Sequence, residues 1–331
     1  ESLIVTNEEY RFYVLDQLRE LSQCPTKIFL EPKALNTAPA LTLAALHAFD
    51  QGSDPILIVT PSDQLIKNKG RFKNSIKDAI RTAVDGTIVI LGISPTKPET
   101  GFGYIKKIGN EGPNNDYCVS QFTEKPDLKK AKEYIKSDDY LWNSGIFVLR
   151  ASKWLEALEE FRPDIIEPTL KSFKNKTFDV NFVRPHPDYF NMIPAESIDY
   201  AVMEKCPNSK FPIKIIPLSI DWNDIGSWSA LWDIGSKDKG GNISSGDVII
   251  EDTKNSIVQS NHRLVATIGI ENTIIVETTD AVMVANKDHC QDVTKIVDKL
   301  ISKSRAEGLT HLKVFRPWGW YQIVDQGEFF K

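Results

Sequence analysis

The sequence predicts an α/β domain with a parallel sheet, followed by a small β domain. Continuous apolar runs such as PILIVT (residues 55–60) and TIVILG (residues 87–92) lie between amphipathic stretches, which is typical of strands covered on both faces. After about Gly240 the chain becomes rich in Ile, Val and Thr, broken by Gly, Asn and Asp, which favours short strands. The 331 residues allow about two domains at ~150 residues each.

In the first part, helices and strands alternate. Val14, Leu15, Leu18 and Leu21 recur at helical spacing, and Asn36 and Thr37 are suited to cap a second helix that continues through His47. Further helices are expected at Arg71–Val84, Leu128–Ser137 and Ser152–Glu160. A short run follows the first helix at Lys27–Glu31. Strands are expected at Pro55–Thr60, Thr87–Gly92, Tyr117–Thr123, Gly145–Arg150 and Ile213–Ser219.

The second part reads as a small β domain with a closing helix. Its strands are expected at Gly246–Ile250, Ser256–Gln259, Leu264–Ile268, Thr273–Glu277 and Ala281–Ala285, and its helix at Asp292–Ser302. The segment lacks the strict six-residue period that would by itself establish a β-helix. The expected domains are therefore residues 1–238 and 239–305, with a linker and the start of a further domain at 306–331.

Composition excludes several classes of function. The 40 basic and 45 acidic residues give a net charge of −5, which argues against nucleic-acid binding as the main task. No apolar window is long enough for a membrane span. The four cysteines, Cys24, Cys118, Cys206 and Cys290, form no C-x-x-C pair, which suits a reducing cytoplasm.

Two aspartates follow strand-like runs and are candidates for a metal site. Asp63 comes directly after the run that ends at Thr60, and Asp224 precedes Gly226, which leaves room for a ligand. Carboxylates at such positions suit Mg²⁺, which binds one or two of them together with substrate phosphates. Each aspartate also has a structural alternative, namely a turn or a helix cap for Asp63 and an Asx-type turn for Asp224.

Three other motifs carry groups that suit a sugar phosphate. Glu124 can accept hydrogen bonds from hydroxyls, and Lys125 can hold a phosphate, although the two are equally readable as a solvated charge pair. The loop before Tyr104 contains Gly103, whose backbone a ligand can approach closely. The alternative is that this loop is a plain β-turn. Asn143 can bind hydroxyls or cap a turn. The sequence contains no P-loop, no G-x-G-x-x-G after a strand, no G-x-S-x-G and no H-E-x-x-H.

Taken together, these segments resemble the sugar-nucleotide pyrophosphorylases, and most closely the mannose-1-phosphate guanylyltransferases of the bacterial type fused to mannose-6-phosphate isomerase. The resemblance covers nearly the whole chain. It rests on NTAPA (36–40), PSD (61–63), PTKPETGFGYI (95–105), FTEKP (122–126), WNSG (142–145), ESIDYAVME (196–204) and DIGSW (224–228). The closing RPWG (316–319) resembles the entry to a cupin-type isomerase domain.

The resemblance implies a Rossmann-like nucleotidyltransferase domain with a mixed, mainly parallel sheet, and a β-helix-like C-terminal domain. It implies transfer of GMP from GTP to mannose 1-phosphate, in the cytoplasm and in the service of polysaccharide biosynthesis. By position, Asp63 and Asp224 would hold Mg²⁺ and act with Lys125 in catalysis. Asn36 and Thr37 would lie near the guanosine, and Gly103, Glu124, Asn143, Gly145 and Asp199 would bind on the sugar side.

The glycine-rich phosphate loop of that family is not among these residues, and we expect it to lie upstream of Glu1. Three alternatives stay open. The chain could serve another sugar 1-phosphate or another base, it could be a non-catalytic relative that binds sugar nucleotides, or its activity could be mannose-6-phosphate isomerisation in a downstream domain. No nucleic-acid or membrane partner is expected, and a homo-oligomer is considered by analogy only.

Overall fold

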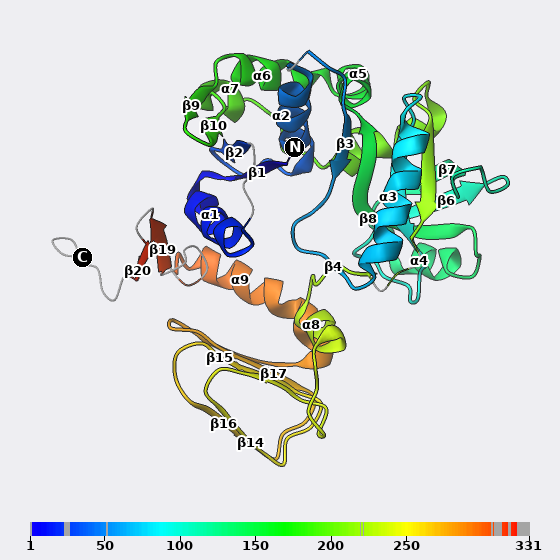
Figure 1. Ribbon diagram of the computed structural model, residues 1–331. Coiled ribbons are helices and arrows are strands. Elements are labelled where there is room, and N and C mark those ends of the chain that lie inside the picture. Colours follow the sequence, from blue (N-terminus) through cyan, green and yellow to red (C-terminus); the bar gives the residue numbers. More distant parts are fainter. Residues whose placement is uncertain are drawn as a thin grey trace. The chain divides into compact units, whose positions relative to one another are not determined.

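The computed structural model describes residues 2–22, 27–50, 52–218, 220, 222–305, 307, 313–316 and 319–322. The chain divides into two compact units (Figure 1). The first comprises residues 1–62 and 66–222, and the second comprises residues 63–65 and 223–331. No helix within the described ranges is both long enough and apolar enough to cross a membrane.

A six-stranded mixed sheet forms the centre of the first unit. Its order is β3 (Ile56–Val59), β8 (Tyr140–Arg150), β5 (Ile88–Ile93), β11 (Ile213–Pro217), β7 (Tyr117–Thr123) and β6 (Tyr104–Ile108). The sheet is mixed, as expected, but most of its neighbouring strands pair in the antiparallel sense, so the expectation of a mainly parallel sheet does not hold for the pairing. Four strands run in one direction, namely β3, β5, β6 and β11, whereas β7 and β8 run in the opposite direction. Because β8 lies between β3 and β5, and β7 lies between β11 and β6, the parallel pair in this sheet is β5 with β11.

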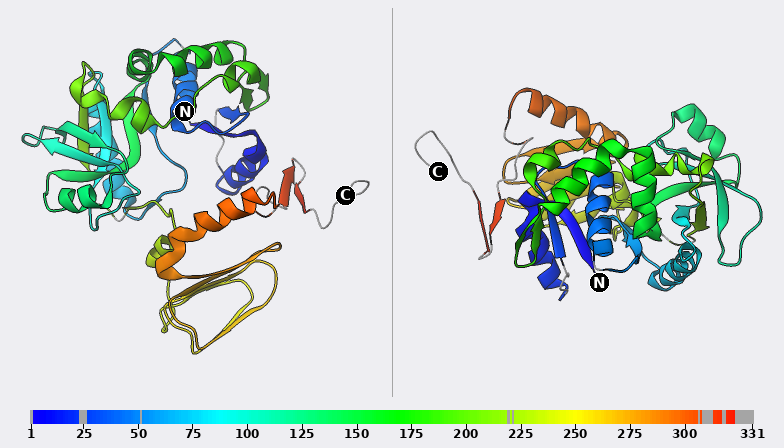
Figure 2. Two further views of the ribbon diagram at one scale, coloured as in Figure 1. Left: turned by 180° about the vertical axis from the view of Figure 1, so that it is seen from behind. Right: turned by 90° about the horizontal axis from the view of Figure 1, so that it is seen from above.

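Both faces of this sheet are covered, which explains the uninterrupted apolar runs. In β5, Ile88 and Ile90 face one core, whereas Val89 and Leu91 face the other. The first core is completed by α2 (Thr37–Asp50), α5 (Ala151–Phe161) and α6 (Pro163–Lys174), and the second by α3 (Lys69–Ala83) and α4 (Leu128–Tyr134). Figure 1 shows α3 against one face of the sheet, and Figure 2 shows the sheet from behind.

A smaller sheet completes the first unit. Strands β1 (Leu3–Asn7), β2 (Lys27–Glu31) and β10 (Phe182–Arg184) are parallel, and β9 (Thr177–Asp179) pairs with β10 in the antiparallel sense. The expected first helix is α1 (Arg11–Glu20), whose Leu15 and Leu18 pack on the apolar side of this sheet. The other short helical elements are η1 (Glu8–Tyr10), α7 (Pro187–Asn191), η2 (Asp199–Met203) and η3 (Cys206–Asn208).

The second unit is built from stacked coils. Strand β13 (Ile243–Ser245) pairs in parallel with β15 (Ile257–Ser260), which pairs in parallel with β17 (Thr273–Glu277). On another side of the coil, β14 (Val248–Glu251) pairs in parallel with β16 (Val265–Ile268). Partners lie 14 to 17 residues apart in the chain, so the repeat is too irregular to stand out in the sequence. The antiparallel β18 (Val282–Asn286) ends the larger sheet, and η4 (Lys287–Asp292) and α9 (Val293–Ser302) follow.

The helix α8 (Trp228–Ile234) belongs to the second unit by its contacts. Its Trp228 and Trp232 pack against the core residues Ile257 and Ile274. The boundary near residue 238 that the sequence suggests stays a prediction. Much of the expected linker and further domain at 306–331, and Cys24, lie outside the described residues, although β19 (Lys313–Arg316) and β20 (Gly319–Gln322) form an antiparallel pair.

Candidate functional site

The turn after β7 presents Glu124 and Lys125 side by side. The Lys125 Nζ lies 3.5 Å from Glu124 Oε1, and the lysine side chain is 59% exposed whereas that of the glutamate is 8% exposed. The other carboxylate oxygen, Glu124 Oε2, is buried and has no hydrogen-bond partner among the described residues. The exposed Lys125 ammonium group therefore lies beside a buried carboxylate oxygen without a hydrogen-bond partner, which a solvated charge pair would not have. This pair of groups suits a ligand that carries both a phosphate and hydroxyl groups.

Gly103 gives the Glu124 carboxylate its space. A Cβ on Gly103 would lie 2.4 Å from Glu124 Oε2 and 3.2 Å from the Cβ of Asn143. The carbonyl of Gly103 accepts a hydrogen bond from the Asn143 backbone N–H (2.8 Å). The sequence therefore needs glycine here because a side chain would fill the position that the carboxylate occupies.

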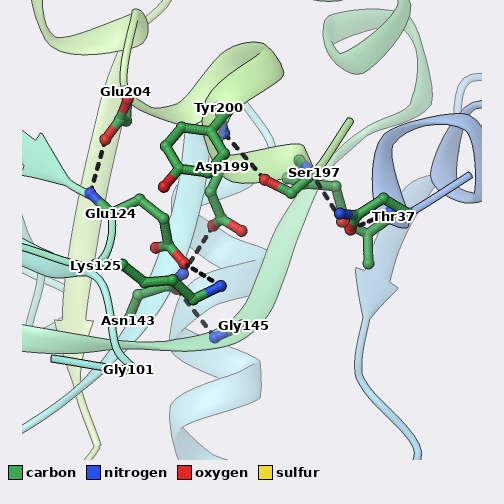
Figure 3. Close-up of polar contacts among 12 residues, drawn as sticks. Thr37, Gly101, Glu124, Lys125, Asn143, Gly145, Ser197, Asp199, Tyr200 and Glu204 are labelled. Atoms are coloured by element: carbon green, nitrogen blue, oxygen red, sulfur yellow. Dashed lines mark hydrogen bonds and ion pairs between the residues drawn. The ribbon is translucent and has the colours of Figure 1, made fainter. Parts of the chain in front are cut away.

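Asn143, Gly145 and Asp199 form a connected group next to Glu124 (Figure 3). The Asn143 side-chain amide donates to Asp199 Oδ1 (2.8 Å), and its Oδ1 accepts from the Gly145 backbone N–H (3.0 Å). Gly145 has φ +72°, a left-handed conformation that glycine adopts without strain. The amide of Asn143 is thereby fixed in one orientation.

Burial changes the protonation of the two carboxyl groups. Desolvation raises the pKa of Glu124 to about 7, and the charge of Asp199 adds to this rise while Lys125 opposes it. Desolvation likewise raises the pKa of Asp199, against the hydrogen bond from Asn143, which lowers it. Near neutral pH the Glu124 carboxyl group can therefore be found in either state.

The loop with Asn36 and Thr37 is tied to the segment that carries Asp199. The Ile198 N–H donates to Thr37 Oγ1 (2.9 Å), and the Ala38 N–H donates to the Glu196 carbonyl (3.1 Å). Asn36 has φ +68°, and its side-chain oxygen accepts from the Thr37 N–H (2.9 Å). Segment 196–204 thus touches both the expected guanosine loop and the expected sugar side.

The same segment supplies a contact that the sequence analysis did not assign. Glu204 Oε1 accepts a hydrogen bond from the backbone N–H of Glu124 (2.7 Å; Figure 3). Its one signal in the sequence is its place in the motif that also contains Asp199, five residues earlier.

Asp63 and Asp224 both belong to the second unit, and each is close in sequence to a short strand that spans the division between the units. Strand β4 (Leu65–Ile66) pairs with β12 (Trp222–Asn223), so the segment after Asp63 runs beside the one before Asp224. A Cβ on Gly226 would lie 2.7 Å from Asp224 Oδ2, so this carboxylate also leans over a glycine. Asn223 Oδ1 accepts from the N–H of Ile225, which has φ +48°, so the Asx-type turn is present but is made by Asn223.

Asp63 and Asp224 are the candidate ligands for a divalent ion. Within the described part of the chain, no group of three or more His, Cys, Asp or Glu side chains could hold a metal ion. Mg²⁺ usually binds one or two carboxylates and leaves its other coordination positions to water and substrate phosphates. An ion held by Asp63 and Asp224 alone would have to complete its coordination with water or substrate.

Comparison with known proteins gives the class. The model of the nucleotidyl transferase family matches residues 1–240, and that of a MannoseP isomerase/GMP-like β-helix domain matches residues 246–300. The chain belongs to the nucleotidyl transferase family, whose members generally use a divalent metal. The expected nucleotidyltransferase fold with a β-helix-like C-terminal domain is confirmed.

Individual relatives narrow the class. The chain is 44% identical over 329 residues (99% of the chain, 69% of the relative) to the xanthan biosynthesis protein XanB of Xanthomonas campestris pv. campestris. It is 42% identical over 328 residues (98% and 69%) to a mannose-1-phosphate guanylyltransferase of Klebsiella pneumoniae. A crystal structure described as mannose-1-phosphate geranyltransferase from Thermus thermophilus superposes with a TM-score of 0.76 at 27% identity (90% and 84%). Within its family, the chain groups with the bacterial mannose-1-phosphate guanylyltransferases.

Proposed function

We propose that the protein transfers GMP from GTP to mannose 1-phosphate, giving GDP-mannose and pyrophosphate. The named relatives support the reaction, and the structural observation that carries it is the buried, unpartnered Glu124 Oε2 beside the exposed Lys125 ammonium. The hydroxyls of a sugar can donate to that oxygen and to the Asp199 carboxylate, while the ammonium faces the phosphate of the same molecule.

The reaction is an in-line attack of a sugar-phosphate oxygen on the α-phosphorus of GTP. The new bond joins that oxygen to the phosphorus, the bond to the β-phosphate bridge breaks, and pyrophosphate leaves with the electron pair. Lys125 offsets the negative charge of the attacking phosphate, and Glu124, Asn143 and Asp199 fix the sugar. Such transfers need positioning and charge stabilisation rather than a covalent nucleophile.

Asp63 and Asp224 are proposed to hold Mg²⁺, which would supply charge neutralisation at the phosphates of GTP. Asn36 and Thr37 are proposed to lie on the guanosine side, where the bonds from segment 196–198 hold their loop. We further propose the domain division given above and a cytoplasmic location. We also propose a role in polysaccharide biosynthesis, because the relative XanB is named for xanthan biosynthesis.

The test is a substrate panel on the full-length protein. Each of GTP, ATP, UTP and dTTP is combined with mannose 1-phosphate or glucose 1-phosphate in the presence of Mg²⁺, and sugar nucleotides are separated by anion-exchange chromatography. GDP-mannose as the main product is expected. A preference for another base or sugar would favour another nucleotidyltransferase, and no product from a folded protein would favour a non-catalytic relative.

The description of the family model for residues 246–300 also names a mannose-phosphate isomerase. Mannose-6-phosphate isomerase activity is therefore the second candidate function. Isomerisation of mannose 6-phosphate is therefore assayed separately on the same preparation. Isomerisation without formation of GDP-mannose would contradict the main proposal.

A further inference from the structure

The backbone at Lys125 is strained. This residue has φ +47°, in the left-handed region that residues with a Cβ adopt at a cost, and it precedes Pro126, which restricts it further. Such a conformation persists only where the surrounding structure holds it. The strain matters because it sets the direction of the lysine side chain relative to Glu124.

The contact that holds this turn comes from far along the chain. The Glu124 N–H, one residue before the strained position, donates to Glu204 Oε1 at 2.7 Å, across 80 residues of sequence. A hydrogen bond to a charged acceptor is shorter and stronger than one between neutral groups. Figure 3 shows the Glu204 side chain reaching the backbone of Glu124 from the segment above the turn.

The helical turn before Glu204 explains how the carboxylate arrives there. Element η2 is a π-helix, and the Glu204 N–H donates to the Asp199 carbonyl, five residues back. In an α-helix, residues five apart point about 140° away from each other, whereas a wider turn brings them closer to one side. Asp199 thereby reaches Asn143 on β8 while Glu204 reaches the end of β7.

The contact also has an electrostatic cost. Desolvation is the main cause of the raised pKa of Glu124, and the negative charges of Asp199 and Glu204 add to it, so three carboxyl groups share a small volume. A neutral acceptor would avoid this repulsion. The geometry that Glu204 imposes on the turn is therefore its most direct contribution.

We infer that Glu204 is a positioning residue for the sugar phosphate: its carboxylate holds the Glu124 N–H and keeps Lys125 and the Glu124 carboxyl group facing the substrate. The inference rests on the proposed function. It assigns Glu204 no contact with substrate, so its effect should fall on the binding of mannose 1-phosphate and not on that of GTP.

Three variants separate reach from charge. Glu204→Gln keeps an acceptor oxygen at the same distance from the backbone but removes the charge. Glu204→Asp keeps the charge but is one methylene too short, and Glu204→Ala removes both. We expect the KM for mannose 1-phosphate to rise about tenfold or more in the Ala and Asp variants and by less than about threefold in the Gln variant. The KM for GTP should change less than about twofold in all three.

The variants are made in the full-length protein, and the dissociation constant of mannose 1-phosphate is measured by calorimetry as well. Glu160→Ala is the control, because Glu160 is an exposed carboxylate on α5 whose ion pair is with Lys210. If Glu204→Ala does not fold, the comparison of Gln with Asp decides.

Two results would overturn the inference: an Asp variant that binds the sugar phosphate better than the Gln variant, or equal rises in KM for both substrates. A wild-type protein that binds no mannose 1-phosphate would instead overturn the proposed function, and this inference with it.

Discussion

At the scale of single residues, three residues in or next to the candidate site have left-handed backbone conformations. Asn36, Lys125 and Ile225 have φ values of +68°, +47° and +48°. Each is a candidate residue itself or the immediate neighbour of one. A β-branched residue such as Ile225 is especially costly in this conformation. Left-handed residues also occur away from the candidate site, as at Val180 with φ +53°, so the three angles describe the local geometry of the site and do not by themselves identify it.

Asp224 gives the most direct test at this scale. We expect Asp224→Asn in the full-length protein to lower kcat at least ~100-fold, the usual effect of losing one preorganised electrostatic group. The substitution keeps the size of the side chain and removes the charge that would hold Mg²⁺. Formation of GDP-mannose is measured by chromatography, with Asp233→Asn on α8 as the control. Near-normal turnover in the folded Asp224 variant would count against its metal role.

Glu124 predicts a dependence on pH. Its pKa of about 7 means that the charged, stronger acceptor form dominates above that value and is lost as the pH falls through it. We therefore expect the affinity for mannose 1-phosphate, measured by calorimetry, to weaken from about pH 8 to about pH 6. Glu124→Gln removes the titrating carboxyl group of the protein, so any pH dependence that remains in this variant comes from the phosphate of the substrate. An unchanged pH profile in this variant would contradict the prediction.

At the scale of elements, the candidate sugar side is built where strands β6, β7 and β8 lie together. Strand β6 pairs with both β7 and β8, so Gly103, just before β6, comes between Glu124 and Asn143. The π-helix η2 then adds Asp199 and Glu204 from a later part of the chain. The arrangement depends on the pairing of strands that are not neighbours in the sequence.

Gly103→Ala tests this arrangement. The new methyl group would displace the Glu124 carboxylate, so we expect the KM for mannose 1-phosphate to rise about tenfold, with little change in Tm because the carboxylate can move. Gly101→Ala is a matched control two residues earlier, since its Cβ would meet only Glu99 Oε1, at 3.7 Å. Equal effects of the two substitutions on KM would show that the Glu124 contact is unimportant.

At the scale of the whole molecule, each compact unit has an apolar core of its own. The first unit has cores on both faces of the large sheet, and the second has a small one that includes Ile257 and Ile274. The candidate sugar side lies in the first unit, whereas Asp63 and Asp224 lie in the second. We therefore attribute the stability of both units mainly to the burial of apolar side chains. A metal held by Asp63 and Asp224 would contribute to catalysis and not to folding.

Removal of metal tests this division of roles. We expect EDTA to abolish GDP-mannose formation and excess Mg²⁺ to restore it. We also expect Tm without nucleotide to change by less than about 2 °C, because a two-carboxylate site leaves folding free energy nearly unaffected, unlike a structural zinc site. A large fall in Tm on chelation, measured by calorimetry, would show a structural metal instead.

The sequence by itself determined the periodic parts of this protein. Apolar runs and helical spacing identified β3, β5, α3 and α5, and the strands β14 to β18 were placed within about two residues, because burial imposes its period directly on the chain. The missed elements include the strands β1, β4, β6, β9, β10, β12 and β13 and the helices α6 and α7. Most of them are short, and a short element leaves a weak pattern in the sequence.

Only the tertiary structure decided the rest. The insertion of β8 between β3 and β5, and the coil repeat of 14 to 17 residues, depend on hydrogen bonds between distant segments. The motifs of the chain named the candidate residues, but they did not show that Glu204 holds the turn at Lys125. A left-handed residue and an acceptor 80 residues away become related only when folding brings them within hydrogen-bond distance.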